Sequence, residues 1–187
     1  MVLINLGGIL DISTIDIPGK ASMVIFTVGC NFKCSFCHNK HLLQPNVGKS
    51  YQISNLIKII ESNPLISSVS ISGGEPTLQE DLLDLCKELN KLEKYISIDT
   101  NGSNPGKIKE LIPYINRVVL DLKGPLNQNK LEKITGVKVN PNKIIETIDF
   151  LKIQEDLDFE IRTTFVESLL STVDFDEILN FLKEIQF

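Results

Sequence analysis

Three cysteines lie within eight residues in the stretch Gly29-Cys30-Asn31-Phe32-Lys33-Cys34-Ser35-Phe36-Cys37-His38-Asn39. Their spacing is C-x₃-C-x₂-C, and the apolar run 23–28 just before it predicts a buried β-strand. In a reducing compartment such a dense group of thiols is typical of metal binding and not of disulfides. The stretch therefore predicts a metal-binding loop that directly follows a strand.

The number of thiols indicates which metal group this loop binds. A fully ligated [4Fe–4S] cluster takes four cysteine thiolates, and only Cys30, Cys34 and Cys37 lie close together in the sequence. Cys86 falls in a segment with helical apolar spacing, so it is expected to be an inert core residue. Three thiolates leave one iron open to chelate the amine and carboxylate of an amino acid. The alternative is a Cys₃His zinc site that includes His38, although the second ligand pair usual in such sites is missing from the sequence.

Strand-length apolar runs alternate with longer amphipathic segments along the rest of the chain. The predicted strands are 23–28, 68–72, 95–99, 117–121 and 159–166, and the predicted helices are 53–62, 78–92, 107–112, 142–154 and 174–184. The spacing of Thr77-Leu78-Gln79-Glu80 is that of a capping box at the start of the second helix. The strands are rich in Val and Ile and alternate poorly, as parallel strands buried on both faces do. Repeated β–α units form either a doubly wound sheet or a barrel.

Glycines and polar residues follow directly where several of these strands end. The segments are Gly73-Gly74-Glu75-Pro76, Asp99-Thr100-Asn101-Gly102 and Asp121-Leu122-Lys123, and Cys30 follows the first strand in the same way. In parallel α/β folds the C-terminal edge of the strands is the edge that binds ligands. We therefore expect these segments to converge on one site at the edge of a sheet with about five β–α units.

Together, the cysteine loop and Gly73-Gly74-Glu75-Pro76 resemble the radical S-adenosylmethionine (SAM) superfamily. The wider pattern is similar to the activating enzymes of glycyl-radical proteins. Its matching segments are Asp16-Ile17-Pro18-Gly19 and the two segments that begin at Asp99 and Asp121. Within that group, Ser13-Thr14-Ile15-Asp16 and the ending Cys37-His38-Asn39 most resemble the anaerobic ribonucleotide reductase activating proteins. The resemblance covers essentially the whole chain.

This resemblance implies an α/β fold, a partial (β/α) barrel of five to six β–α units with a mostly parallel sheet. It also implies that residues 1–187 form a single radical SAM domain. The chain ends after its fifth unit, where the family supplies a sixth strand. Either the chain is truncated, or a partner or a second copy completes the site.

The resemblance assigns the cofactors to particular residues. Cys30, Cys34 and Cys37 are expected to hold a [4Fe–4S] cluster that reductively cleaves SAM to a 5′-deoxyadenosyl radical. The methionyl amino group is expected to lie against Gly73, Gly74 and Glu75, for which a plain turn is the alternative. Phe36 is expected to pack against the adenine ring or to shield the cluster.

The remaining site residues are charged or polar. Hard oxygen ligands on adjacent strand ends suit a hard cation, and the resemblance implies that Asp99, Thr100 and Asp121 bind a monovalent cation beside the methionyl carboxylate. Lys123 is expected to supply positive charge to that carboxylate or to the substrate. Solvated charges at strand ends are the alternative.

Arg162 is one of only two arginines in the chain and lies in a strand-like run. A buried guanidinium needs an anion or several acceptors, so it is expected to face the methionyl carboxylate or the ribose. A salt bridge to Glu160 or Glu167 is the alternative. Family resemblance also implies that Asp16 positions the glycine loop of the partner protein at the C-terminal strand edge. A plain loop is the alternative there.

Composition narrows the class of function. The 187 residues carry a formal charge of −5 and a pI near 5.1, which argues against a nucleic-acid-binding protein. No apolar run approaches the ~20 residues of a membrane helix, and no signal peptide is recognisable, so no membrane association and a cytoplasmic location are expected.

The leading hypothesis is activation of a glycyl-radical enzyme, anaerobic ribonucleoside-triphosphate reductase, with flavodoxin or ferredoxin as reductant. A small-molecule radical SAM enzyme similar to 7-carboxy-7-deazaguanine synthase is the alternative. A non-catalytic iron–sulfur electron carrier is a third hypothesis, but it leaves Glu75, Asp99 and Asp121 without a role.

Overall fold

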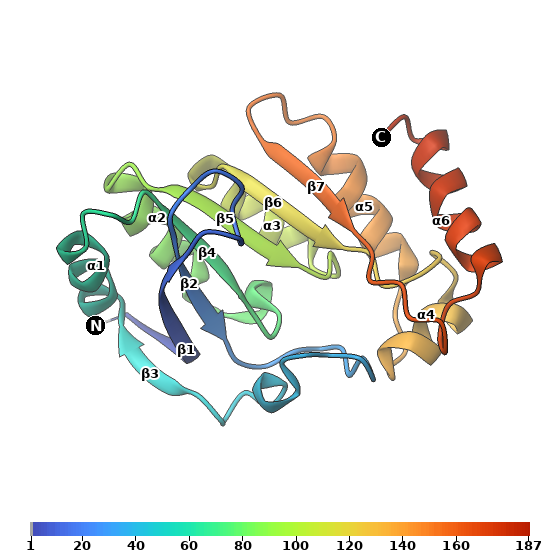
Figure 1. Cartoon of the computed structure of the whole chain (residues 1–187), viewed down its shortest axis with the longest axis horizontal. Coiled ribbons are helices and arrows are strands. Elements are labelled where there is room, and N and C mark those ends of the chain that lie inside the picture. Colours follow the sequence, from blue (N-terminus) through green and yellow to red (C-terminus); the bar gives the residue numbers. More distant parts are fainter. Residues whose placement is uncertain (1) are drawn as a thin grey trace.

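A computed structural model describes residues 2–187 of the chain. Within that range, seven strands form one sheet with the order β3-β1-β2-β4-β5-β6-β7 (Figure 1). The strands are β1 (Leu3–Ser13), β2 (Ser22–Thr27), β3 (Lys49–Gln52), β4 (Ser68–Gly73), β5 (Tyr95–Thr100), β6 (Arg117–Asp121) and β7 (Asp158–Arg162). The α-helices are α1 (Ile53–Ser62), α2 (Leu82–Lys91), α3 (Pro105–Leu111), α4 (Gln128–Thr135), α5 (Pro141–Leu151) and α6 (Thr172–Glu184). No helix in this part of the chain is long and apolar enough to cross a membrane.

The five predicted strands all form, and they are the five parallel strands of the sheet. β2, β4, β5, β6 and β7 are neighbours in the order in which they occur along the chain. Successive right-handed crossovers that advance in one direction place their helices on one face of the sheet, as in a barrel. A doubly wound sheet would instead reverse its order. The sheet does not close, because its order ends at β3 and β7, so the expected partial barrel is confirmed.

The antiparallel part of the sheet was not predicted from the sequence. β1 pairs antiparallel with both β2 and β3. Its pairing with β2 shifts register between Leu6 and Gly8 and again between Leu10 and Ser13. These irregularities interrupt the alternation by which a half-buried strand is recognised in a sequence. The short helix α4 was also missed.

The start of the second helix differs from the prediction. Pro76–Leu78 form a 3₁₀ turn, and α2 begins only at Leu82. Thr77 does not cap a helix, because its hydroxyl donates to the Glu75 carboxylate, and Glu75 itself caps the 3₁₀ turn. A buried acceptor two residues upstream therefore overrides the local capping pattern. The last predicted strand, 159–166, is likewise shorter and ends at Arg162.

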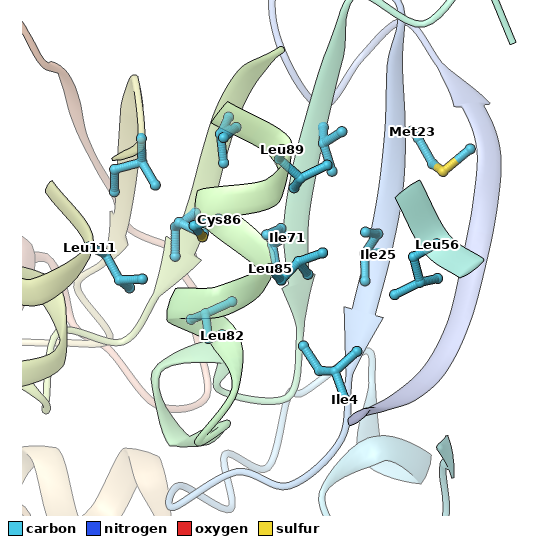
Figure 2. Packing of buried hydrophobic residues seen from close by; sticks show 14 of the residues in the cluster. Ile4, Met23, Ile25, Leu56, Ile71, Leu82, Leu85, Cys86, Leu89 and Leu111 are labelled. Carbon is cyan, nitrogen blue, oxygen red and sulfur yellow. The ribbon is translucent and has the colours of Figure 1, made fainter. Parts of the chain in front are cut away.

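The larger core lies between the sheet and the helices α1, α2 and α3 (Figure 2). In α2, the positions Leu82, Leu85, Cys86 and Leu89 are fully buried. Their i, i+3, i+4, i+7 spacing places them on one helix face. The structure thus confirms that Cys86 is a core residue, on the helix side of the sheet.

A second hydrophobic cluster anchors the cysteine loop. Phe32 and Cys34 of the loop pack with residues of β6, α4, α5 and α6, among them Leu120, Leu131 and Ile148. The backbone N–H of Lys33 also donates to the carbonyl oxygen of Thr135 at the end of α4, over 2.7 Å. The loop is therefore fixed both by apolar packing and by a main-chain hydrogen bond.

Candidate active site

The predicted site residues converge at the C-terminal edge of the parallel strands. They border a cavity of about 220 Å³ there. Its lining includes Cys30, Cys34, Phe36, Cys37, Gly73, Gly74, Glu75, Asp99, Thr100, Asp121 and Lys123. Of the residues expected to hold the cluster, SAM or a cation, Arg162 alone lies outside the lining, and it contacts the cavity residues Asp99 and Asp121.

The cysteine loop is held to the chain segment that follows it. The N–H groups of Gly29 and Cys30 donate to the carbonyl oxygens of Leu42 and Leu43, at 2.7 and 3.1 Å. Within the loop, the N–H of Cys37 donates to the carbonyl oxygen of Cys34. Cys34 is buried, and Cys30 and Cys37 are half-buried. The thiols are therefore presented by a fixed backbone.

Burial makes two of these thiols poor acids. It raises the pKa of Cys30 to about 11 and also raises the pKa of Cys34. The N–H of Phe32 donates to the Cys30 sulfur over 3.4 Å and opposes the shift. Thiolates here need a positive charge beside them, which a bound iron ion would provide. Across residues 2–187, no three His, Cys, Asp or Glu side chains are arranged to hold one metal ion.

Gly73 and Gly74 allow two strand ends to approach each other closely. A Cβ on Gly74 would lie 2.2 Å from the carbonyl oxygen of Gly29, and Gly73 has a φ of 106°. The Gly74 N–H donates to the carbonyl oxygen of Thr27, and the Glu75 N–H donates to that of Gly29. The missing Cβ atoms thus face the backbone that leads into the cysteine loop. Both glycines also line the cavity, so the place of the methionyl amino group against them stays a prediction.

Glu75 is completely buried, with an exposed fraction of 1%. Its Oε1 accepts hydrogen bonds from the N–H and hydroxyl of Thr77 and from the hydroxyl of Thr100, and its Oε2 accepts from the N–H of Asn101. Burial raises its pKa, and these donors act in the opposite direction. Four donors use most of the acceptor capacity of one carboxylate. The side chain therefore connects the turn after β4 to the end of β5.

Two acidic and two basic side chains form a cluster at the ends of β5, β6 and β7. Arg162 contacts Asp99 through Nη2 at 3.0 Å and Asp121 through Nε at 3.4 Å. Lys123 contacts the other oxygen of Asp121 at 3.1 Å. Burial raises the pKa of Asp99, although the Arg162 charge opposes that shift. The alternative salt bridges of Arg162, to Glu160 or Glu167, are not formed in residues 2–187, and Glu160 pairs with Arg117 instead.

Some residues in or beside the cavity were not predicted to belong to the site. Ser72 donates to Oδ2 of Asp99 over 3.1 Å, and Thr164 also lines the cavity. Asn31 of the cysteine loop accepts a 2.9 Å hydrogen bond from the side chain of Asn101. Ser72 could have been found, because it immediately precedes Gly73 at a predicted strand end. The pairing of Asn31 with Asn101 leaves no local signal in the sequence.

Asp16 does not lie where it was expected. Its main-chain oxygen accepts a 3.2 Å hydrogen bond from Arg117, the first residue of β6, whereas Asp121 is the last. Asp16 therefore lies at the N-terminal edge of the strands, and the expected convergence with Asp121 is wrong. The segment between β1 and β2 that carries it runs across the sheet (Figure 1) and borders a second cavity of about 410 Å³, lined in part by Ile17 and Glu160.

Comparison with known proteins identifies this arrangement. Residues 24–185 match the family model of the Radical SAM superfamily. The chain belongs to this superfamily. It is 37% identical over 185 residues to a Methanocaldococcus jannaschii protein named provisionally as a glycyl-radical enzyme activating enzyme, with 95% of this chain and 75% of that protein covered. It is also 30% identical to the pyruvate formate-lyase-activating enzyme of Clostridium pasteurianum, over 100% of this chain and 79% of that protein.

Solved structures show the same fold. The crystal structure of Streptococcus suis SuiB bound to S-adenosylmethionine superimposes with a TM-score of 0.69 at 23% identity. The match covers 88% of this chain and 38% of the SuiB chain. This radical SAM chain is thus an enzyme of the glycyl-radical activating group, and its family implies a [4Fe–4S] cluster and SAM. Three thiols on the wall of one cavity, with no fourth beside them, suit a cluster that keeps one iron open.

Proposed function

We propose that this chain reductively cleaves SAM and uses the 5′-deoxyadenosyl radical to remove a hydrogen atom from a glycine of a partner enzyme. The proposed partner is anaerobic ribonucleoside-triphosphate reductase, with flavodoxin or ferredoxin as the electron donor. The observation that carries the proposal is that the cysteine loop, the turn after β4 and the acidic ends of β5 and β6 border one cavity. When bound, the [4Fe–4S] cluster supplies the electron for the cleavage.

The residues of the cavity divide between the cluster and SAM. Cys30, Cys34 and Cys37 would ligate the cluster, and Phe36 would shield it or meet the adenine ring. The Lys123 ammonium lies 5.9 Å from the centre of the Phe36 ring. Lys123 therefore joins the cysteine side of the cavity to the acidic side, where the methionyl carboxylate would take its charge.

The turn after β4 is proposed to hold the methionyl ammonium group. Gly73 and Gly74 line the cavity with backbone atoms, which can accept from an ammonium. Glu75 contributes mainly through the turn that it fixes, because its two oxygens already accept four hydrogen bonds. A direct contact between Glu75 and the ammonium stays a prediction. A positive charge between Asp99 and Asp121, expected from the sequence as a monovalent cation, is part of the same proposal.

The partner's glycine loop needs access to the same cavity. The sheet ends at β3 and β7 without closing, so no further strand borders the site beside β7. Asp16 lies on the segment that crosses the sheet, one strand length from the cavity end of β6. We propose that the glycine loop passes between this segment and the cavity, with Asp16 as a guide at its far end.

The test has two arms that use the reconstituted holoenzyme. Reduced protein with SAM alone is expected to release 5′-deoxyadenosine and methionine. Addition of an anaerobic ribonucleotide reductase from the same organism is expected to produce a doublet glycyl signal in electron paramagnetic resonance. Asp16→Ala should lower the glycyl signal and leave cleavage without partner largely unchanged.

The two arms separate the competing hypotheses. Failure to cleave SAM at all would contradict radical chemistry and favour the electron carrier. Cleavage without a glycyl signal on any glycyl-radical enzyme, together with turnover of a small heterocycle, would favour the deazaguanine-synthase-like alternative. A signal on a different glycyl-radical enzyme would keep the activase function and replace the partner.

A further inference from the structure

The acidic cluster beside the cavity is a poor fit for the metal cation that the sequence suggested. A cation site needs oxygen atoms with free lone pairs directed at one point. Oδ2 of Asp99 already receives the Ser72 hydroxyl and the Arg162 guanidinium. Both oxygens of Asp121 face a positive side chain, Arg162 at Oδ1 and Lys123 at Oδ2.

Thr100, the third expected ligand, is directed elsewhere. Its hydroxyl donates to Oε1 of Glu75 over 2.7 Å and accepts from the N–H of Gly102 over 3.1 Å. The side chain is buried, with an exposed fraction of 2%. Its oxygen therefore belongs to the hydrogen-bond network around Glu75. Two of the three expected ligand side chains remain, and both already contact Arg162.

The guanidinium of Arg162 can take the place of a metal cation between Asp99 and Asp121. Its planar fork offers donors in two directions, and it keeps its charge at any physiological pH. Nη2 reaches the end of β5 at Asp99, and Nε reaches the end of β6 at Asp121. With Lys123, two positive side chains balance two carboxylates. A metal cation added between Asp99 and Asp121 would meet the repulsion of Arg162 at close range.

We propose that Arg162 is the built-in cation of the SAM site, in the place between Asp99 and Asp121 that a monovalent metal ion would otherwise take. SAM binding by this chain then needs neither K⁺ nor Na⁺. This inference rests on the proposed function, since it places SAM in the cavity beside these carboxylates. Arg162 acts here as a positioning residue, because it contacts Asp99 and Asp121 and does not itself line the cavity.

The first experiment measures SAM affinity in matched salts. The reconstituted holoenzyme is titrated with SAM in NaCl, KCl or choline chloride at equal ionic strength. The wild type is expected to bind equally, within about twofold, in all three. Arg162→Gln is expected to bind about tenfold more weakly in choline chloride and to recover with Na⁺ or K⁺, because the half-buried Asp99 then loses its positive partner and Asp121 keeps only Lys123. The double variant D99N/R162Q should show no recovery.

A second readout follows the cation itself and needs no SAM. The sodium-23 magnetic resonance line is expected to broaden when the Arg162→Gln variant is added. The wild type is expected to broaden it no more than the control variant does. Arg117→Gln is the matched control, since it removes the other arginine, at the opposite strand edge. Arg162→Lys keeps a positive charge and is expected to stay independent of Na⁺, which covers the case that the glutamine variant does not fold.

The outcomes are distinct. Saturable tightening of SAM binding to the wild type by Na⁺ or K⁺, but not by choline, would overturn the inference and restore a metal cation. An Arg162→Gln variant that binds SAM equally in every salt, without sodium broadening, would also overturn it. A wild type that binds no SAM in any salt would contradict the proposed function, and the sodium measurement would still decide the role of Arg162.

Discussion

The main-chain N–H of Asn101 donates a 2.7 Å hydrogen bond to Oε2 of Glu75. This bond joins the end of β5 to the turn after β4, and the Thr100 hydroxyl joins the same two segments through Oε1. Two motifs that look separate in the sequence are therefore one hydrogen-bonded unit. The shape of this side of the cavity depends on a single buried carboxylate.

Glu75→Gln should destabilise this unit while leaving the cluster in place. The amide nitrogen of glutamine would replace one carboxylate oxygen and would face a donor, which leaves buried donors unpaired. The expected loss is about 1–3 kcal/mol of unfolding free energy, with weaker SAM binding and an unchanged iron content. Urea unfolding, SAM titration and iron analysis would measure these effects. Glu155→Gln, at an exposed position, is the control, and wild-type stability and SAM affinity in the Glu75 variant would contradict this role.

Gly74→Ala should separate the turn after β4 from the cysteine loop. The new Cβ would lie 2.2 Å from the carbonyl oxygen of Gly29, so the backbone must move. Overpacking of this kind costs about 1–3 kcal/mol, and the same displacement should impair cluster assembly. Gly8→Ala is the matched control, because a Cβ there meets no atom within 4 Å. Equal thermal stability and equal cluster content in the two variants would refute the close approach.

The four cysteines should divide into two functional classes. Cys34→Ala is expected to abolish the cluster after anaerobic reconstitution, whereas Cys86→Ala should retain about four irons and four sulfides per chain. Cys34 lines the cavity at the strand ends, and Cys86 lies in the core between the sheet and the helices. Iron and sulfide analysis with visible absorption would show the difference. Stoichiometric zinc without sulfide in the wild type would contradict the iron–sulfur assignment.

Cys86 should also give the stability a specific alkaline pH dependence. Burial raises the pKa of its thiol from 9.0 to about 12. Between these values the unfolded chain loses a proton that the folded chain retains. The free energy of unfolding therefore falls as the pH rises, by up to about 1.4 kcal/mol per pH unit from this group.

Anaerobic urea unfolding of the wild type and Cys86→Ala at pH 8 and pH 10 would isolate this contribution. Other groups titrate equally in both proteins, so only the difference between them matters. The wild type should lose more stability than the variant over this range. A parallel decline in both would show that the thiol ionises as readily in the folded protein as in the unfolded chain.

The sequence alone determined the parallel part of the fold and the location of the site. The runs at β2 and β6 are continuous and apolar, as in strands buried on both faces. β4, β5 and β7 carry Val, Ile or Phe at alternate positions, which also indicates a strand. The site residues follow these runs directly, so the parallel arrangement necessarily brings them to one edge. The three thiols needed only their spacing to be recognised.

Only the tertiary structure decided which of these residues contact one another. Glu75 meets Asn101 across 26 positions of sequence, and Arg162 lies on a different strand from either of its partners, Asp99 and Asp121. Such pairings depend on strand order and register, which no local pattern encodes. The same holds for β1, whose bulged antiparallel pairing carries Asp16 to the opposite edge of the sheet. The local sequence thus determined which residues lie at the site. The packing of segments distant in the sequence determined which partners, and therefore which role, each side chain has.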